Sequence, residues 1–320
     1  MAYNLFGADF APLAIAYGLS FIALLAGSIT DLKTREVPDW LNYGLMISGI
    51  GLNLLFSVIY FGKSIAIKDI TFNDQLVHQY ILSSQSYLLK SIICLVIFFG
   101  IAYIMFYAGQ WGGGDSKILM GLGAMIGIDV GNIGQQFLLG FFINALFVGA
   151  IYGLLWSIFL VFKNKKKFGK EFKRIASMEN AVKAKKFMLA ALFFLLVFLF
   201  FIDLIYIKIL ALSFAFLILT AFYLWIFVKA VEKSCMYKLV EPSKLTEGDW
   251  IVKDVYVGKQ YICGPKDLGI EKKQIGKLVE FYKKGKVKKI LIKEGVPFVP
   301  SFFIAFVVTL VLGSPLAYLI

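Results

Sequence analysis

Long apolar runs recur along this chain, and each is close to the length that a helix needs to cross a bilayer. About 20 apolar residues are enough to span the hydrocarbon core as an α-helix. With 60% hydrophobic residues and a mean hydropathy of +0.80, the chain is predicted to be an all-α polytopic membrane protein. About eight transmembrane helices are expected, at roughly 11–30, 40–61, 88–108, 115–128, 136–162, 187–202, 205–229 and 297–320.

One stretch differs from the rest and is predicted to be a small α+β module in water. Residues 230–296 carry many lysines, and apolar and polar residues alternate from Trp250 to Val257. Such alternation predicts a strand, a helical pattern follows at roughly 270–284, and 287–292 has the pattern of another strand. The sequence thus predicts a membrane-embedded helix bundle at 1–229, the module at 230–296 and a final transmembrane helix at 297–320.

Basic residues are unevenly spread, and their distribution predicts how the chain is threaded through the membrane. Lys and Arg number 33 against 20 Asp and Glu, a net charge of +13. In a membrane protein the positive-inside rule explains this excess better than nucleic acid does, so no nucleic-acid partner is expected. If the loop with Lys33 and Arg35 is cytoplasmic, the basic run at 163–186 and the module are cytoplasmic too, while 63–86 lies outside. We therefore expect a multi-pass protein of the plasma membrane, surrounded by the lipid bilayer.

A glycine-rich sequence, Gly112-Gly113-Gly114-Asp115, lies between two of the apolar runs. Consecutive glycines let the backbone turn tightly and approach other backbone closely. A carboxylate at the edge of a membrane is costly and needs a reason. One reason is a helix N-cap, because Asp is favoured there and suits the positive end of the helix dipole.

A second aspartate, Asp31, ends the first apolar run, and the threading brings it to the same face as Asp115. Two close carboxylates cannot both ionise cheaply, so one keeps a proton and the pair titrates as a unit. Such a pair can activate water and protonate a leaving amine, which is the chemistry of aspartic proteolysis. The alternative for Asp31 is a solvated helix end, with Lys33 and Arg35 as anchors.

Two further aspartates are weaker candidates. Asp39 follows a proline and is expected to cap the second helix. Asp129 is expected on the opposite face of the membrane.

Other catalytic chemistries lack the residues that they need. His78 is the only histidine, which excludes a His-Glu-x-x-His metalloprotease, and no Gly-x-Ser-x-Gly elbow occurs. Cys94, Cys235 and Cys263 show no paired spacing, so neither a zinc site nor a disulfide framework is predicted. We expect no metal and no cofactor.

Three features together carry a resemblance to a known family. Asp31 ends the first helix and a basic, Pro-containing segment follows; a Gly-x-Gly-Asp motif opens the fourth helix; and a Gly-x-Pro-Phe sequence precedes the last helix. The residues concerned are Lys33, Arg35, Val37 and Pro38; Gly112, Gly114, Asp115, Ser116 and Lys117; and Gly295, Pro297 and Phe298. In this pattern the chain resembles the prepilin peptidases, which are Gly-x-Gly-Asp membrane aspartyl proteases, and among them the archaeal preflagellin and type IV prepilin peptidases.

The resemblance covers roughly residues 11–162 and implies a catalytic pair, Asp31 and Asp115, supported by Gly112 and Gly114. It also implies cleavage of a short basic leader from a precursor whose next segment is a hydrophobic helix. Bacterial relatives often carry a Cys-x-x-Cys loop and also methylate the new N-terminus. This chain has no such loop, so cleavage alone is expected, without a methyl donor or zinc. Whether the precursor is a pilin or a flagellin, and the oligomeric state, stay open.

Two functions of other classes compete with this interpretation. An ion- or proton-coupled transporter could use the aspartate pair as a relay, but it would need acidic groups at mid-membrane depth. A scaffold protein would use residues 230–296 as its working part. Lys117 is expected to anchor its helix at the membrane interface, because a residue two positions past Asp115 does not face it on a helix.

Overall fold

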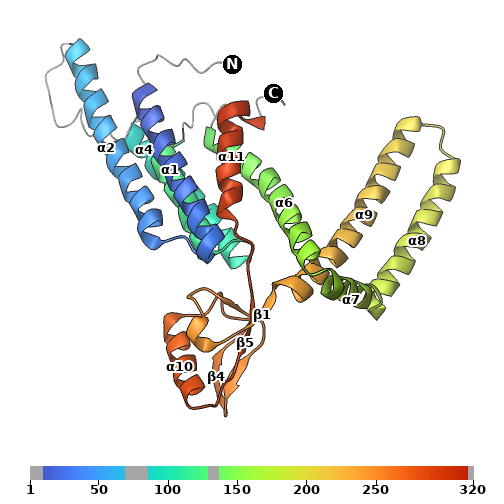
Figure 1. The fold of residues 1–320 in the computed structure, drawn as a ribbon. Coiled ribbons are helices and arrows are strands. Elements are labelled where there is room, and N and C mark those ends of the chain that lie inside the picture. Colours follow the sequence, from blue (N-terminus) through green and yellow to red (C-terminus); the bar gives the residue numbers. More distant parts are fainter. Residues whose placement is uncertain (1–9, 69–85, 129–136, 316–320) are drawn as a thin grey trace. The chain divides into compact units, whose positions relative to one another are not determined.

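A computed structural model describes residues 10–68, 86–128 and 137–315 of the 320-residue chain. Helices dominate these ranges, and the strands are few and short (Figure 1). The chain divides into two compact units, each described here by itself. The first comprises Met1–Gly153 and Val296–Ile320, and the second comprises Leu154–Gly295.

Five helices within the described ranges are long and apolar enough to cross a membrane, which confirms the prediction of a polytopic helical membrane protein. They are Ala11–Thr34, Asp39–Tyr60, Tyr87–Tyr107, Phe137–Lys163 and Ile205–Met236. The other three expected spans do not meet these criteria of length and apolar composition. Helices α5 (Gly113–Ile126) and α11 (Val299–Leu312) have 14 residues each, and the first half of α8 (Glu179–Phe200) carries charged residues. The count of eight stays a prediction.

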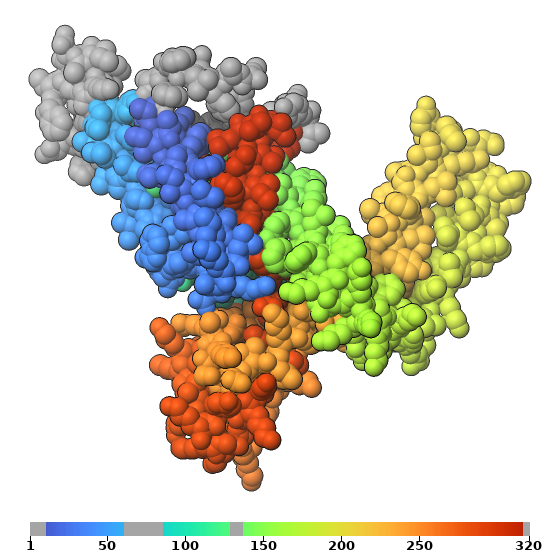
Figure 2. Space-filling view, viewed as in Figure 1, coloured from blue at the N-terminus to red at the C-terminus, as the bar shows by residue number. Residues whose placement is uncertain are grey.

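The first unit is a bundle of helices around one apolar core. Its members are α1 (Phe10–Thr34), α2 (Asp39–Lys68), α4 (Tyr87–Tyr107), α5, the first part of α6 (Phe137–Lys163) and α11. Helix α5 packs between α2 and α4, and α11 lies beside α1, as the red and blue helices of Figures 1 and 2 show. The fully buried side chains of this core include Leu24, Ile118, Leu122, Phe141, Phe302 and Phe306.

Close approach between α2 and α5 depends on a glycine and is fixed by buried polar side chains. A Cβ at Gly49 would lie 2.7 Å from the backbone of Ala124 and Met125, so the helices could not approach this closely with a larger residue. The Asn53 amide nitrogen donates to the carbonyl oxygens of Ala124 and Met125, at 3.1 and 3.0 Å, and the Ser91 hydroxyl also donates to that of Ala124. The carbonyls at the end of α5 are therefore paired by neighbouring helices.

Helix α2 runs on to Lys68, so the expected end of the second helix near residue 61 is wrong, although the apolar span within it ends at Tyr60. No proline interrupts the sequence after Gly62, and the residues that follow Lys63 are mostly apolar, so nothing there ends the helix. Residues 69–85, which include His78, lie outside the described residues, and so does Asp129.

In the second unit, the basic run after α6 forms a helix. Helix α7 (Lys165–Ala176) turns Phe168, Phe172 and Ile175 toward α9 (Ile205–Val231), where they pack with Ile226. Their spacing of four and three residues puts them on one helical face, which leaves the lysines on the other. Helices α8 and α9 lie side by side as a hairpin, yellow in Figures 1 and 2.

The same unit contains a small domain of two sheets and one helix. Strands β1 (Tyr237–Val240), β5 (Ile290–Lys293) and β2 (Trp250–Ile251) form an antiparallel sheet with β5 in the centre, and β3 (Val255–Val257) pairs with β4 (Gln260–Cys263). Helix α10 (Lys272–Lys283) buries Leu278 against them.

Two strand predictions in this domain need correction. The single strand expected at 250–257 is split, because the chain bends at 252–254 and its two halves join different sheets. Strand β5 begins at Ile290 rather than at 287.

Candidate active site

Asp31 lies in the last turn of α1, where its side chain is almost fully buried. Its carboxyl Oδ2 accepts a hydrogen bond from the backbone N–H of Val299, the first residue of α11, at 3.0 Å. The residue as a whole is 5% exposed. The N–H of Arg35 donates to the main-chain oxygen of Asp31 at 2.9 Å, and Arg35 then adopts a left-handed φ of 61°. The solvated helix end considered for Asp31 is therefore wrong, since α11 covers this carboxylate.

Asp115 is the third residue of α5 and is half-buried. Its Oδ2 accepts the backbone N–H of Gly112, at 2.9 Å. The N-cap position belongs to Gly112, so the N-cap assignment for Asp115 is wrong by three residues. A carboxylate at the third position still satisfies a free amide at the helix start, as the acid of a capping box does.

The fold brings these two carboxyl groups, 84 positions apart in sequence, into one site of the first unit. Helix α1 packs against α5, and the charge of Asp31 acts on Asp115. Gly27, one turn before Asp31, allows this approach, because a Cβ there would lie 3.0 Å from the Ile118 side chain of α5. Two carboxyl groups in one partly buried site cannot both ionise cheaply, so the site can hold one shared proton.

The two motif glycines differ in what surrounds them. A Cβ at Gly114 would lie 3.1 Å from the Val37 side chain, in the connection between α1 and α2. Gly112 has φ −73° and ψ 167°, an extended conformation open to any residue, and an added Cβ would meet only the Asp115 carboxyl, at 3.3 Å. The requirement for glycine is therefore steric at Gly114 and weaker at Gly112.

Aromatic side chains that the sequence analysis did not single out fix the glycine loop. Trp111 is 4% exposed, and its ring contacts those of Phe298 and Phe302, at centroid distances of 6.3 and 5.3 Å. Gly149 of α6 leaves room for the Phe298 ring, since a Cβ there would lie 2.6 Å from it. A tryptophan directly before a glycine motif was the available signal, but its partner lies almost 190 residues away in sequence.

Lys117 and Asp39 form an ion pair at the edge of this site. The Lys117 Nζ lies 2.6 Å from the Asp39 Oδ1 and 5.2 Å from the centre of the Tyr43 ring. Both side chains are partly exposed, and neither contributes to the pair of buried carboxylates. The role of Lys117 as an interface anchor stays a prediction. Asp39 was expected to cap the second helix, but its carboxylate pairs with Lys117.

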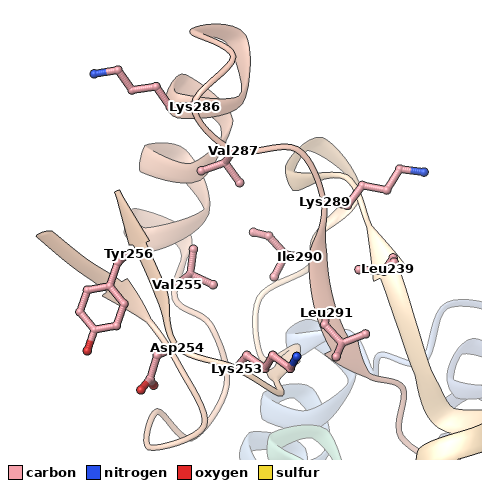
Figure 3. Close-up of a pocket in the computed structure, with 10 residues that line it drawn as sticks. All are labelled: Leu239, Lys253, Asp254, Val255, Tyr256, Lys286, Val287, Lys289, Ile290 and Leu291. Atoms are coloured by element: carbon pink, nitrogen blue, oxygen red, sulfur yellow. The ribbon is translucent and has the colours of Figure 1, made fainter. Parts of the chain in front are cut away.

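The domain with the two sheets contains a cavity, but the charged groups that line it do not converge. A cavity of about 540 Å³ lies between β5 and β3, lined by Lys253, Lys286 and Lys289 among others (Figure 3). Figure 3 shows the side chains of Lys286 and Lys289 pointing in different directions, away from a common centre. Beside it, burial and then the charges of two aspartates raise the pKa of Cys263 to about 11, so its thiol is a poor nucleophile.

Among the described residues, no group of three His, Cys, Asp or Glu side chains could hold a metal ion. The three cysteines are buried and free.

Comparison with known proteins connects the first unit to a peptidase family. Residues 18–154 match the sequence model of the type IV leader peptidase family. The chain is 34% identical over 105 residues to a preflagellin peptidase of Methanocaldococcus jannaschii and 29% identical over 180 residues to one of Methanococcus voltae. A third preflagellin peptidase, from Methanococcus maripaludis, is 32% identical over 112 residues. No solved structure matches the chain.

These matches are partial in both directions. They cover 33%, 54% and 35% of this chain, and 35%, 62% and 39% of the three relatives. The family match contains both Asp31 and Asp115, and it ends where the second unit begins. Both aspartates thus lie in the segment of the chain, residues 18–154, that is similar to the type IV leader peptidase family.

Proposed function

We propose that this chain is a membrane aspartic endopeptidase that cleaves the short basic leader from type IV pilin-like or flagellin-like precursors. One observation carries the proposal: Asp31 lies in the last turn of α1 and Asp115 in the first turn of α5, two helices that pack together inside the segment that matches the leader peptidase family. Relatives named preflagellin peptidase support a precursor of the flagellin type. We base the aspartic mechanism on the two carboxyl groups, which can act as general base and general acid.

The chemistry of the pair is acid–base catalysis on a peptide bond. The ionised carboxylate takes a proton from water as the water oxygen adds to the scissile carbonyl carbon. The protonated carboxyl group gives its proton to the nitrogen as the carbon–nitrogen bond breaks. A final proton transfer between the two carboxyl groups restores the starting state.

We place the site at the cytoplasmic face of the plasma membrane. The basic residues that follow Asp31 and those around α7 support this orientation through the positive-inside rule. A precursor held by its hydrophobic helix in the bilayer would then present its leader to the two carboxyl groups. The leader's positive charge complements them.

The test is cleavage of leader-bearing precursors by the purified chain in liposomes. Asp31→Asn and Asp115→Asn should each lower the rate by about 10²- to 10⁴-fold, and the double variant should lose little more, because the two groups act as a unit. Asp39→Asn is the matched control, since Asp39 is an exposed acid near the same boundary and should not be needed. Normal cleavage by Asp31→Asn would refute the aspartic mechanism.

The position of the cut tests the proposed depth of the site. Precursors whose leader junction is shifted stepwise into the apolar segment should stop being cut after several residues, as read by mass spectrometry of the products. Efficient cutting deep inside the apolar segment would argue against a site at the interface.

A further inference from the structure

Helix α7 lies where two membrane helices end. Helix α6 ends at Lys163 and α7 begins at Lys165, so a single residue separates them. Ile226, which packs against α7, belongs to the last two turns of α9. The thiol of Cys235, just after α9, donates to the carbonyl oxygen of Leu160 near the end of α6, at 3.7 Å. The ends of α6 and α9 are therefore neighbours, and α7 lies at the boundary where both leave the apolar region.

The apolar face of α7 is already covered by protein. The ring centroids of Phe168 and Phe172 are 5.6 Å apart, and that of Phe168 lies 5.6 Å from the ring centroid of Phe227 on α9. Ile175, on the same face, is 2% exposed. An amphipathic helix at a bilayer surface buries its apolar face among the lipids. Because that face of α7 packs on α9, its charged face is the one that is available to a partner.

The basic segment carries far more cations than its own acids can neutralise. Residues 163–186 contain ten basic side chains and two acidic ones, Glu171 and Glu179. These acids pair with Arg174 and Lys183, at 2.7 and 2.6 Å. Eight lysines therefore have no acidic partner within the segment.

Three of these lysines form a row on α7, here called the lysine row. Lys166, Lys170 and Lys173 are exposed and follow one another at spacings of four and three residues. This spacing puts them on one helical face, opposite Phe168 and Phe172. Like charges at such spacings repel each other and destabilise a helix. An anionic surface beside the lysine row would offset this repulsion.

The chemistry of the segment fits the headgroups of anionic lipids. Nine of its ten cations are lysines, whose ammonium groups act as point charges. Arginine is the residue that holds a single phosphate group with two parallel hydrogen bonds. A row of point charges is better suited to a layer of many phosphate groups, which is what a bilayer surface presents. The position of α7 beside the ends of two membrane helices brings the lysine row to such a surface.

We propose that the lysine row of α7 is a docking surface for the phosphate groups of anionic lipids, in the leaflet at which α6 and α9 both end. The interaction is electrostatic and does not insert α7 among the acyl chains. It goes beyond the proposed function, because it concerns the second unit and does not involve Asp31 or Asp115.

The preference of the α7 surface for an anionic lipid over a neutral one tests the proposal. The purified full chain would carry a fluorophore at Met178→Cys, an exposed position directly after α7, since the native cysteines are buried. Quenching by headgroup-labelled phosphatidylglycerol and phosphatidylcholine in liposomes gives the preference. Replacing all three lysines of the row by glutamine should lower the preference for phosphatidylglycerol by about five-fold or more, because each lysine near the surface attracts anionic lipid. An unchanged preference would overturn the proposal.

Two further variants separate the lysine row from charge in general. Lys272, Lys273 and Lys277 are exposed lysines of α10, and their replacement by glutamine removes the same charge from another surface. This matched control should keep the preference of the parent chain. Arginine at all three positions of the row keeps the charge and should keep the preference as well. An equal loss in the α10 variant would overturn the assignment to α7.

A salt titration needs no change in the lysines, so the folding and threading of a variant cannot affect it. The preference for phosphatidylglycerol should fall as sodium chloride is raised, because salt screens exposed charges over about 10 Å at 0.1 M. A preference that is absent at low salt, or that persists unchanged at high salt, would overturn the proposal. If a short RNA duplex changed the fluorescence and phosphatidylglycerol did not, the surface would be assigned to nucleic acid instead.

Discussion

Helices α4 and α9 are equally apolar, yet they are used in different ways. Each has a mean hydropathy of 2.4, but 22% of the residues in the α4 span are buried within the protein, against 6% in the α9 span. Helix α4 turns Ser91, Cys94 and Phe98 onto a neighbouring helix. In the α8–α9 hairpin, large side chains such as Phe200 and Phe216 are mostly exposed, at 82% and 72%. Hydropathy therefore identifies a membrane helix but does not distinguish packing on protein from packing on lipid.

The two regions also differ in their content of glycine. Of its 29 glycines, none lies between Gly169 and Gly248, the stretch that contains the whole hairpin. Helix α5 alone contains four, and a Cβ at Gly123 would lie 3.1 Å from the Cys94 carbonyl oxygen of α4. Small residues let helices approach in a membrane, where apolar surfaces gain little from each other that lipid does not also offer. The bundle with the aspartates is built for close contact between helices, and the hairpin is not.

The largest effect is expected where a glycine adjoins the aspartate pair. Gly114→Val should lower precursor cleavage by about 10- to 100-fold, because its side chain would displace Val37 and shift the start of α5. Gly112→Ala should be milder, since that position is extended and open except toward Asp115. Initial rates and membrane insertion would be measured for both. Full activity of Gly114→Val would mean that the motif is a loose linker.

Two glycines of α2 give a matched test of stability. Gly49→Ala should lower the free energy of unfolding by about 1–3 kcal/mol, because the new methyl group would overlap the backbone of α5. Gly51→Ala adds the same group on an open face and should be neutral or slightly stabilising. Thermal unfolding in detergent measures both. Equal melting temperatures of Gly49→Ala and Gly51→Ala would contradict the proposed difference between packed and lipid-facing surfaces.

Polar side chains in apolar helices sharpen the same comparison. Asn53→Leu leaves the buried Met125 carbonyl of α5 without its side-chain donor and the Ala124 carbonyl with only that of Ser91, and it should cost about 1–3 kcal/mol. Ser213 of α9 donates only to Ile209 of its own helix, at 2.8 Å, and is exposed. Ser213→Ala should therefore change stability by less than about 0.5 kcal/mol. A larger loss in Ser213→Ala than in Asn53→Leu would show that the hairpin, too, depends on polar contacts.

The smallest effect is expected for the exposed ion pair. Lys117→Arg keeps the charge and Lys117→Met removes it, and neither should change stability by more than about 1 kcal/mol, because both partners are partly exposed. The measurement is again the melting temperature, together with the cleavage rate. Loss of all cleavage by a well-inserted Lys117→Arg would assign this lysine a specific role beside the substrate.

Much of the fold follows from local patterns, which is why it could be predicted. The apolar runs gave the centres of α1, α4, α6 and α9, and the triple glycine gave the start of α5 to within two residues. The predictions of secondary structure were wrong where a local pattern is compatible with two structures. Alternation at 250–257 fits one long strand or two short ones, and only the partner strands decide. Lysines spread through α7 concealed the helical spacing of Phe168, Phe172 and Ile175.

The site could be predicted only as far as side chains reveal it. Asp31 and Asp115 are acids in apolar surroundings, and this local contrast marks them in the sequence. The amide of Val299 has no such mark, since every residue except proline carries one. Its importance comes from the arrival of α11 beside α1, a contact across 268 positions of the chain. A pattern of residue types cannot show where the fold places a main-chain group.

The length of α5 has a consequence for the bilayer itself. Fourteen residues rise about 21 Å, whereas the hydrocarbon core is about 30 Å thick. A helix of this length that begins at one interface ends at the depth of the acyl chains, and the end of α5 lies there between α2 and α4. There is no water at that depth to hydrate its last carbonyl groups. Asn53 and Ser91 take the place of that water, so a short helix can end inside the membrane without drawing the lipid surface inward to meet it.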